Sequence, residues 1–197
     1  MAINLKKGQR ISLKKEAPGL TKLMCGLGWD VVESGGFLGI FKGDDFDLDA
    51  SVLCLSNSGK LKSKSDVVYF SNLNHYSGAI THLGDNLTGA GTGDDEQILV
   101  DLPRVPDDIY KLVFVVNIYN CIQRKQSFGQ VKNAFVRLVD LSNNKEIARY
   151  SLLGEEYEGK TGMILAEVSR DNGEWKMEAV GKGLMVNGLQ EMTKDYY

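Results

Sequence analysis

The sequence predicts an all-β fold, mostly an antiparallel β-sandwich with short helical segments and a C-terminal helix. Apolar and polar residues alternate over many short stretches, and this is the period of a half-buried strand. The stretches follow one another without long helices between them, as in a sandwich and unlike a parallel α/β sheet. Asp171-Asn172-Gly173 predicts a tight hairpin between the last two stretches. Leu184, Leu189 and Met192 predict the short terminal helix.

The predicted strands are taken here in chain order. The N-terminal segment is partly extended before Pro18-Gly19-Leu20 turns the chain. In Phe46–Val52 the apolar residues face one way, while Asp47 and Asp49 face the other. Asn143-Asn144 predicts a second, weaker hairpin. Further strands are predicted at Leu23–Gly28, Val67–Ser71, Gln97–Leu102, Lys111–Tyr119, Ala134–Asp140, Glu146–Ser151, Met163–Ser169 and Glu174–Val180.

Length and composition favour one domain, residues 1–197, located in the cytoplasm. The 197 residues are 43% hydrophobic, enough for a full core, and carry a formal net charge of −3. This charge, without a basic stripe between aromatic residues, predicts that no nucleic acid is bound. No apolar run approaches the ~20 residues of a membrane span, and the start has no apolar segment of a secretory signal. Cys25, Cys54 and Cys121 are widely separated, which fits buried thiols in a reducing compartment.

The candidate functional residues concentrate in the stretch Gly84–Ile98, GDNLTGAGTGDDEQI. Gly89, Gly91 and Gly93 allow tight turns with positive φ, so that carbonyls and carboxylates can face one point. Such a cage of oxygens is the ligand set of a hard cation, and Ca²⁺ accepts irregular geometry that Mg²⁺ resists. The side-chain ligands predicted in this stretch are Asp85, Asn86, Asp94, Asp95 and Glu96.

A second acidic cluster lies upstream at Asp44–Asp49. Because Asp47 and Asp49 share a strand face, both can reach one ion. Neither acidic stretch contains Lys or Arg, and two like charges ~4 Å apart repel by about 4 kcal/mol at an effective dielectric of about 20. We therefore expect folding to be coupled to Ca²⁺ binding. On the same reasoning, Asp94→Asn and Asp95→Asn are expected to raise the stability of the calcium-free protein.

Other interpretations of the acidic stretch were weighed against a calcium cage. The residues from Asp85 to Glu96 have the length of an EF-hand loop, but Leu87, Gly89 and Ala90 stand where that loop needs two Asp or Asn residues and then Gly. The G-x-G-x-G pattern could cradle a phosphate, although four carboxylates oppose an anion. A solvated turn is the remaining alternative.

Two further features bear on function. The apolar excursion Ser34–Gly43 is either a loop folded back on the core or a contact surface for a partner or a membrane. His75 and His82 are the chain's two histidines, and no known catalytic motif accompanies them. We expect both histidines to be hydrogen-bonded structural residues and the protein not to be an enzyme.

Motifs spread over nearly the whole chain occur in a recognisable order. They are L-x-K-G-Q at Leu5–Gln9, GLGWD at Gly26–Asp30, FDLDAS at Phe46–Ser51, the stretch Gly84–Ile98, SFGQVKNAFVRLVD at Ser127–Asp140 and GEWKMEAVGKG at Gly173–Gly183. With these motifs the chain resembles the TerD family, the tellurium-resistance and general-stress group of bacteria. The block from Gly84 to Ile98 is the most specific of them.

The resemblance implies a compact β-sandwich that binds Ca²⁺, usually at two neighbouring sites, with no established catalytic activity. It implies expression under chemical or envelope stress and a link to tellurite, phage or colicin resistance. Other stress or tellurium-resistance proteins are the expected partners, with the membrane surface as a further one. The resemblance places Asp30 beside Asp47, Asp49 and the acidic stretch as a candidate ligand. A similar slime-mould protein, first described as binding cyclic AMP, keeps a Ca²⁺-assisted nucleotide or phosphate binder or enzyme as the alternative.

Two positions depart from the family pattern. Many members have Asp where this chain has Thr92, so one calcium site is expected to be weaker here. Many also have Asp at the start of the strand after the second hairpin, where this chain has Ser151. The three scattered cysteines cannot form a preorganised thiolate site without close spacing. We therefore expect protection against tellurite without direct detoxification.

Overall fold

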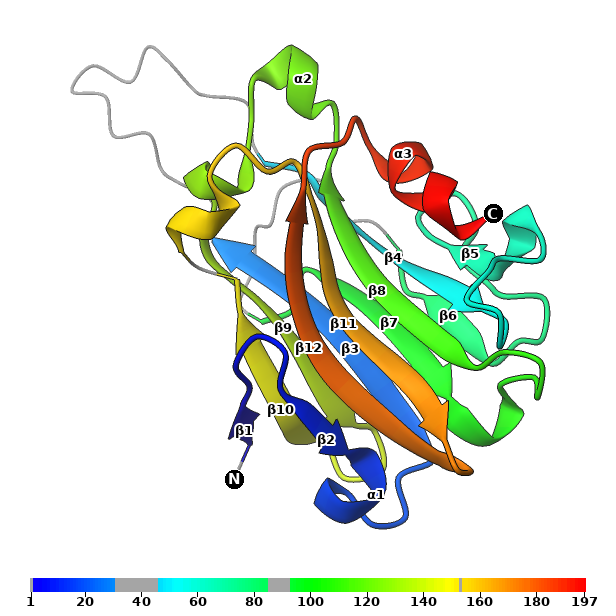
Figure 1. The fold of residues 1–197 in the computed structure, drawn as a ribbon. Helices are drawn as coiled ribbons and strands as arrows, with labels where there is room; N and C mark the ends of the chain where they lie inside the picture. The colour runs from blue at the N-terminus through cyan, green and yellow to red at the C-terminus, as the bar shows by residue number, and fades with distance from the viewer. Residues whose placement is uncertain (1, 31–45, 85–92, 153) are drawn as a thin grey trace.

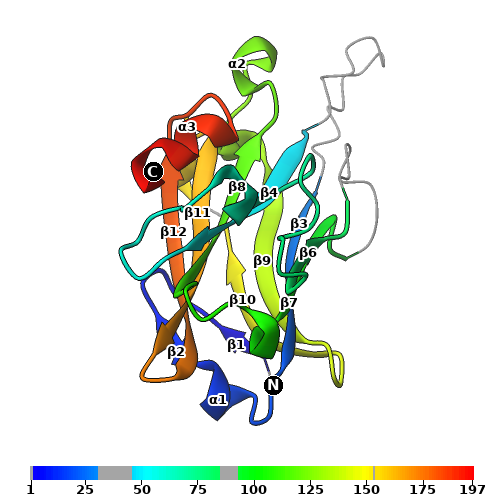
Figure 2. The same cartoon turned by 90° about the vertical axis from the view of Figure 1, so that its right-hand side faces the viewer.

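The structure is a computed structural model, and it describes residues 2–30, 46–84, 93–152 and 154–197. These residues form two sheets packed face to face (Figure 1), and the view in Figure 2 shows them as two layers. The predicted β-sandwich with short helical segments is therefore confirmed. The apolar excursion Ser34–Gly43 lies outside the described residues.

Sheet A has the strand order β1-β10-β9-β3-β7-β6. All its neighbours pair antiparallel except β1 and β10, which are parallel. Its strands are β1 (Ile3–Asn4), β3 (Lys22–Asp30), β6 (Ile80–His82), β7 (Glu96–Asp101), β9 (Lys132–Asp140) and β10 (Lys145–Ser151).

Sheet B has the strand order β2-β12-β11-β8-β4-β5, and all its neighbours pair antiparallel. The predicted hairpin between β11 and β12 is confirmed, because Asn172 and Gly173 adopt φ of 52° and 79°, the left-handed pair that a tight hairpin requires. The strands are β2 (Arg10–Ser12), β4 (Leu48–Leu55), β5 (Val67–Val68), β8 (Lys111–Ile118), β11 (Gly162–Asp171) and β12 (Glu174–Leu184).

Short helices fill the connections. The α-helices are α1 (Leu13–Glu16), α2 (Cys121–Arg124) and α3 (Leu189–Thr193), and the 3-10 turns are η1 (Lys64–Asp66), η2 (Leu102–Arg104), η3 (Phe128–Gln130), η4 (Glu155–Tyr157) and η5 (Lys194–Tyr196). The predicted terminal helix is α3, but Leu184 ends β12 instead of joining that helix. Within the described ranges, no helix combines the length and apolarity needed to cross a membrane.

The core has two layers, because sheet B is covered on both faces. Leu48, Ala50 and Val52 of β4 face sheet A in the main core, while Leu53 and Leu55 face outward. The outward residues join a second cluster that includes residues of α3, which lies against sheet B in Figure 2. Burying a large aliphatic side chain stabilises a fold by about 1.5–3 kcal/mol. The C-terminal segment is therefore part of the fold and closes one face of sheet B.

Candidate metal centre

Three parts of the chain that are distant in the sequence meet at one end of the sandwich. The end of β3, the start of β4 and the residues that lead into β7 are joined by direct contacts. Leu27 of β3 pairs with Glu96 of β7, and its carbonyl accepts a hydrogen bond of 2.8 Å from the Asp95 amide. The Ala50 amide of β4 donates to the Glu96 carboxylate. These contacts bring Asp95 to the end of β3 and Glu96 to Ala50, the residue that follows the second acidic cluster.

Asp95 is fixed to the end of β3. Its carboxylate accepts a hydrogen bond of 2.9 Å from the Trp29 amide, while its own amide is bound to Leu27. A carboxylate bound to a backbone amide is held in one orientation. Asp30 follows Trp29 at the end of β3, so its backbone lies beside the Asp95 segment. Gly93 has φ of 121°, in agreement with the predicted positive φ.

Glu96 and His82 join the two sheets. Both side chains are 0% exposed, and His82 Nε2 lies 3.7 Å from the Glu96 carboxylate and 3.2 Å from the Ala50 carbonyl oxygen. The Gly84 amide donates to His82 Nδ1 at 3.1 Å, which assigns the proton to Nε2. Ala50 lies on β4 before the residues that pair with β5. Its buried amide and carbonyl are instead bound by two side chains of sheet A, Glu96 and His82. His82 is thus a hydrogen-bonded structural residue, as expected.

Asp94 lies on the outer face of sheet A and is bound to an arginine. Arg137 donates to its two carboxylate oxygens at 2.7 Å and 2.9 Å, and the Asp94 side chain is 0% exposed. Arg137 also donates to Glu146 at 3.1 Å, and Glu146 accepts from Arg149 at 3.0 Å. The hydrogen bond to Asp94 raises the pKa of Arg137 further above its usual value. The Arg149 guanidinium lies 3.9 Å from the centre of the Phe135 ring.

This pairing corrects one expectation from the sequence. Repulsion among acids was expected to make Asp94→Asn stabilising, but a cation from β9 already compensates the charge of Asp94. We now expect Asp94→Asn to destabilise the protein. Arg104, the base closest to the stretch along the sequence, instead donates to the Ser77 carbonyl at 3.5 Å.

Two glycines of the GLGWD motif create the room for this arrangement. A Cβ atom on Gly26 would lie 2.3 Å from Asp94 Cγ, and one on Gly28 would lie 2.5 Å from Phe135 Cζ. Neither contact is possible for real atoms without movement. Sequence reasoning missed both roles, although glycine at alternate positions of a predicted strand is a signal of close approach by another group.

Asp49 lies on a different surface from Asp94. It is directly opposite Asn117 of β8, whose Nδ2 donates to its carboxylate at 3.1 Å. Since Leu48 and Ala50 face the core, Asp49 faces the outer side of sheet B. Asp47 precedes β4, and its carbonyl accepts from the Tyr119 amide at 2.9 Å. Asp47 and Asp49 are both buried, being 5% and 4% exposed.

The predicted ligands are therefore only partly brought together. Asp94 and Asp49 lie on opposite outer faces of a sandwich whose sheets are about 10 Å apart. Within the part of the chain that the structure describes, no group of three or more His, Cys, Asp or Glu side chains could hold a metal ion. Asp85, Asn86, Gly89 and Gly91 lie outside the described residues, and the Asp30 side chain is likewise not described.

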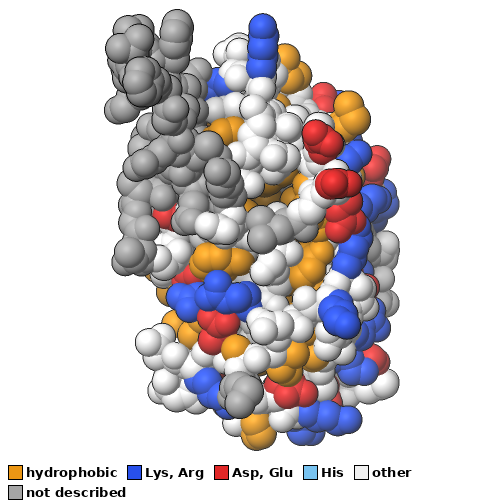
Figure 3. Space-filling view, turned by 90° about the vertical axis from the view of Figure 1, so that its left-hand side faces the viewer, with side chains coloured by type: hydrophobic (Ala, Val, Ile, Leu, Met, Phe, Trp, Pro, Cys, Tyr) orange, Lys and Arg blue, Asp and Glu red, His pale blue; other side chains and the backbone are white. Residues whose placement is uncertain are grey.

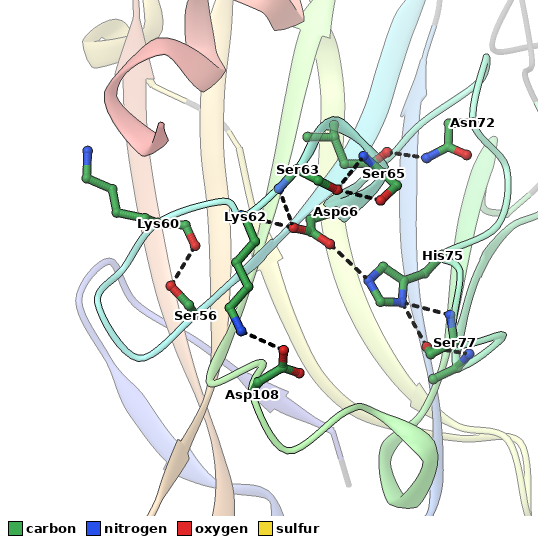
Figure 4. A network of polar contacts seen from close by, with 12 residues as sticks. Ser56, Lys60, Lys62, Ser63, Ser65, Asp66, Asn72, His75, Ser77 and Asp108 are labelled. Atoms are coloured by element: carbon green, nitrogen blue, oxygen red, sulfur yellow. Dashed lines mark hydrogen bonds and ion pairs between the residues drawn. The ribbon is translucent and has the colours of Figure 1, made fainter.

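The other histidine belongs to a separate polar network (Figure 4). Asp66 accepts a hydrogen bond of 2.8 Å from the Ser63 amide and lies 3.5 Å from His75 Nε2, while His75 Nδ1 is 2.8 Å from the Ser77 hydroxyl. The Ser77 amide also donates to Nδ1 at 3.3 Å. Burial lowers the pKa of His75 and favours its neutral form. This Asp-His-Ser series fixes the connection between β4 and β6, the structural role expected for His75.

The cysteines are buried, as the sequence predicts. Cys25, Cys54 and Cys121 are free and buried, and burial raises the pKa values of Cys25 and Cys54 so that these thiols stay protonated at neutral pH. On the face shown in Figure 3, Lys and Arg side chains lie among Asp and Glu side chains and form no separate basic area.

The fold and its acidic end define a class of protein, a two-sheet β-sandwich with acidic segments gathered at one end. The TerD domain matches residues 1–196, and the chain belongs to the TerD family. It is 52% identical over 202 residues to stress response protein SCP2 of Bacillus subtilis (strain 168), covering 100% of both chains. It is 43% identical over 196 residues to tellurium resistance protein TerD of Serratia marcescens, covering 100% of this chain and 97% of that one.

A solved structure supports the fold. A homologue of telluride resistance protein (TerD) from Streptomyces coelicolor A3(2) superposes with a TM-score of 0.66 at 22% identity. The superposition covers 91% of this chain and 99% of that one. The family resemblance found in the sequence motifs is therefore confirmed, and the protein is of the tellurium-resistance and stress-response type.

Proposed function

We propose that this protein is a calcium-binding stress protein of the cytoplasm that has no chemistry of its own. In this role it acts as an adaptor whose bound ion orders a surface for a partner, such as another stress or tellurium-resistance protein or the membrane surface. The observation that carries the proposal is the meeting of the acidic stretches. Asp95 is bound to the Trp29 amide and Glu96 to the Ala50 amide, so the acidic segment that leads into β7 is held against the end of β3 and the start of β4.

The contacts suggest different roles for the acids. Asp47 and Asp95 are proposed as ligands. Asp47 is buried and Asp95 is half-buried, and carboxylate oxygens are the donors that a hard cation prefers. Asp94 and Glu96 are proposed to hold the segments in place through Arg137 and Ala50. Asp49 faces the outer side of sheet B, where Asn117 donates to its carboxylate. The remaining oxygens of the one or two ions would come from Asp30, Asp85, Asn86, Gly89, Gly91 and Gly93.

A cation at this end would act on stability as well as on shape. Bound calcium would reduce the repulsion among the carboxylates that it joins, and this coupling favours the folded state. Linkage adds about 2.7 kcal/mol when the free ion is in hundredfold excess over its dissociation constant. Such a gain would order the connections between the strands and make the surface at this end depend on calcium.

The alternative, a Ca²⁺-assisted nucleotide or phosphate binder or enzyme, needs a cationic side chain turned toward the ligand. Arg137 reaches the acidic stretch, but its guanidinium donates to Asp94 and Glu146. Arg104 donates to the Ser77 carbonyl. Because both arginines donate to oxygens of the protein, neither is turned toward a bound anion. We therefore prefer the adaptor proposal to the nucleotide or phosphate binder.

Calorimetry of the full-length protein tests the proposal. The parent is expected to bind Ca²⁺ and to melt several degrees higher in Ca²⁺ than in chelator, with Mg²⁺ a poor substitute. Asp47→Asn combined with Asp95→Asn should weaken Ca²⁺ binding by about tenfold or more, because two carboxylates leave the ligand set. Asp195→Asn, an exposed acid on η5, is the matched control and should bind as the parent does. Equal melting temperatures of the parent in Ca²⁺ and in chelator would contradict the proposal.

A further inference from the structure

A pocket of about 450 Å³ lies between the C-terminal segment and the edge of sheet B. One wall is formed by η1, β5 and Tyr69, and the other by α3 and η5 (Figure 1). A hydrogen bond of 2.6 Å from the Leu61 amide to the Tyr196 carbonyl holds the C-terminal segment beside the chain that leads into η1. The lining residues are Lys64, Val67, Tyr69, Leu189, Gln190, Thr193, Lys194 and Tyr197.

The floor of this pocket is apolar. Val67 is buried and belongs to the apolar cluster on the outer face of sheet B, against which Tyr69 and Leu189 also pack. Tyr197, which is 52% exposed, adds a second aromatic side chain to the lining. An apolar group that enters the pocket would exchange contact with water for contact with these side chains, and this exchange is favourable in proportion to the area removed from water.

The charged side chains of the pocket are lysines. Lys64 from η1 and Lys194 from η5 are both exposed, and none of the described lining residues is Asp or Glu. Lys64 forms no salt bridge within the described part of the chain. Lys194 Nζ lies 3.8 Å from the Glu191 carboxylate, which is longer than a hydrogen bond, and both side chains are exposed. Because such a surface pair contributes little, both ammonium groups can turn toward a bound anion.

The negative groups beside the pocket have other partners or lie outside the lining. The Glu191 carboxylate accepts a hydrogen bond of 2.9 Å from the Asn187 amide. The Tyr197 backbone oxygen accepts one of 2.5 Å from Lys60 Nζ, and Lys60 is not a lining residue. Asp195 on η5 is outside the lining as well. The described lining therefore offers two ammonium groups above an apolar floor.

We propose that this pocket binds a small carboxylic acid with an aliphatic body. The carboxylate lies at Lys64 and Lys194, and the aliphatic chain lies on the floor at Val67 and Leu189. The volume falls within the range of about 300–1,000 Å³ that is usual for small-molecule sites. None of the residues proposed as calcium ligands belongs to the described lining, so this inference goes beyond the proposed function and does not depend on it.

Other ligand classes match only part of this lining. A hard cation takes carboxylate oxygens, and the described lining residues have no carboxylate side chain. Inorganic phosphate would bind at the lysines but would leave the apolar floor in contact with water. An aliphatic alcohol would cover the floor without using the two ammonium groups, and an aliphatic amine would meet two like charges. A carboxylate with an aliphatic body uses both features, and these partial matches serve as the controls below.

Titration calorimetry of the full-length protein in chelator tests the proposal. Octanoate is expected to bind with a dissociation constant below about 1 mM. Octan-1-ol, octylammonium and inorganic phosphate should each bind at least about tenfold more weakly, because each lacks either the negative charge or the apolar body. Absence of octanoate binding would overturn the proposal, and so would equally tight binding of any of the three controls.

The length of the acid tests the role of the apolar floor. Hexanoate and butyrate carry the same charge as octanoate but bury fewer methylene groups. Each loss of two methylenes should weaken binding by about tenfold, since every buried methylene adds to the affinity. Butyrate that binds as tightly as octanoate would show that the lysines alone hold the anion, and the pocket would then be rejected.

A double substitution locates the binding. Lys64→Gln combined with Lys194→Gln should weaken octanoate binding by about tenfold or more, because both charged donors to the carboxylate are lost. Both lysines are exposed, so the stability of this variant should stay near that of the parent. Lys15→Gln combined with Lys145→Gln removes two exposed lysines outside the lining and should bind as the parent does. Unchanged binding in the first variant, or an equal loss in both, would overturn the proposal.

Discussion

Each sheet carries a buried aspartate on its outer face, and the two aspartates have different kinds of partner. On sheet A, Asp94 lies against Gly26 and is closed by two hydrogen bonds from Arg137. On sheet B, Asp49 is bound to the amide of Asn117 and lines a pocket. The two aspartates stand in equally acidic stretches of the sequence. Asp94 is paired with a cation from β9, whereas Asp49 accepts a hydrogen bond from a neutral amide of β8.

The largest expected effect on stability comes from breaking the ion pair between Arg137 and Asp94. Arg137→Ala leaves the Asp94 carboxylate, which is 0% exposed, without its cation. Breaking a buried pair in this way costs about 3–5 kcal/mol, and we expect about 3 kcal/mol because Arg137 is itself 26% exposed. Urea unfolding at pH 7 measures the loss. Arg10→Ala is the control, since the Arg10–Glu178 pair is exposed and should cost about 0–1 kcal/mol.

A double variant sharpens this result. If the cost comes from an uncompensated buried charge, Asp94→Asn added to Arg137→Ala should recover part of the lost stability. Asp94→Asn alone should cost less than Arg137→Ala, since Arg137 keeps its contact with Glu146. A double variant no more stable than Arg137→Ala would show that the arginine acts through packing and not through the charge of Asp94.

The same comparison shows how far the sequence could be followed. Alternation placed Asp47 and Asp49 on one side of a strand, and Asp49 does face away from the core of Leu48 and Ala50. Alternation carries no information about which strand lies alongside. The pairing of β3 with β7 and β9 brings Arg137 to Asp94, and the pairing of β4 with β8 brings Asn117 to Asp49. These are long-range contacts, and one sequence without an alignment does not specify them.

The strands themselves were easier to predict than their ends. The long strands were found because their apolar residues alternate or run together, and the hairpin at Asn172-Gly173 because both residues tolerate positive φ. β6 was missed, since three residues are too few for a period to show. Val67–Ser71 was predicted too long, because after Val68 the chain leaves the ladder for the connection that carries His75.

Filling the space above Gly26 should give an intermediate effect. A Cβ atom there would lie 2.3 Å from Asp94 Cγ, so the carboxylate must leave Arg137 or the strand must shift. We expect Gly26→Ala to destabilise the protein by about 1–3 kcal/mol, the usual cost of overpacking. The measurement is the midpoint of urea unfolding at constant slope. Gly183→Ala is the comparison, because its Cβ would lie 2.7 Å from Lys160 Cγ, which crowds a side chain without displacing an ion pair. Equal stability of Gly26→Ala and the parent would mean that the ion pair tolerates displacement.

The smallest effect is expected from pH, and it isolates the outer part of the ion network on sheet A. The hydrogen bond from Arg149, followed by that from Arg137, holds the pKa of Glu146 below its ordinary value of 4.5. A carboxyl whose pKa is lowered by folding contributes stability that is fully present above the unfolded value and is lost as pH falls through the folded value. The parent should therefore exceed Glu146→Gln in stability at pH 7 by about 1 kcal/mol or less, since the side chain is partly exposed. The gap should close as pH falls from 4.5 toward 3, whereas Glu155→Gln, an exposed acid on η4, should show little gap at any pH. Urea unfolding of the three proteins between pH 3 and pH 7 measures this. A gap of the same size at both ends of the range would show that Glu146 acts by hydrogen bonding that survives protonation and not by its charge.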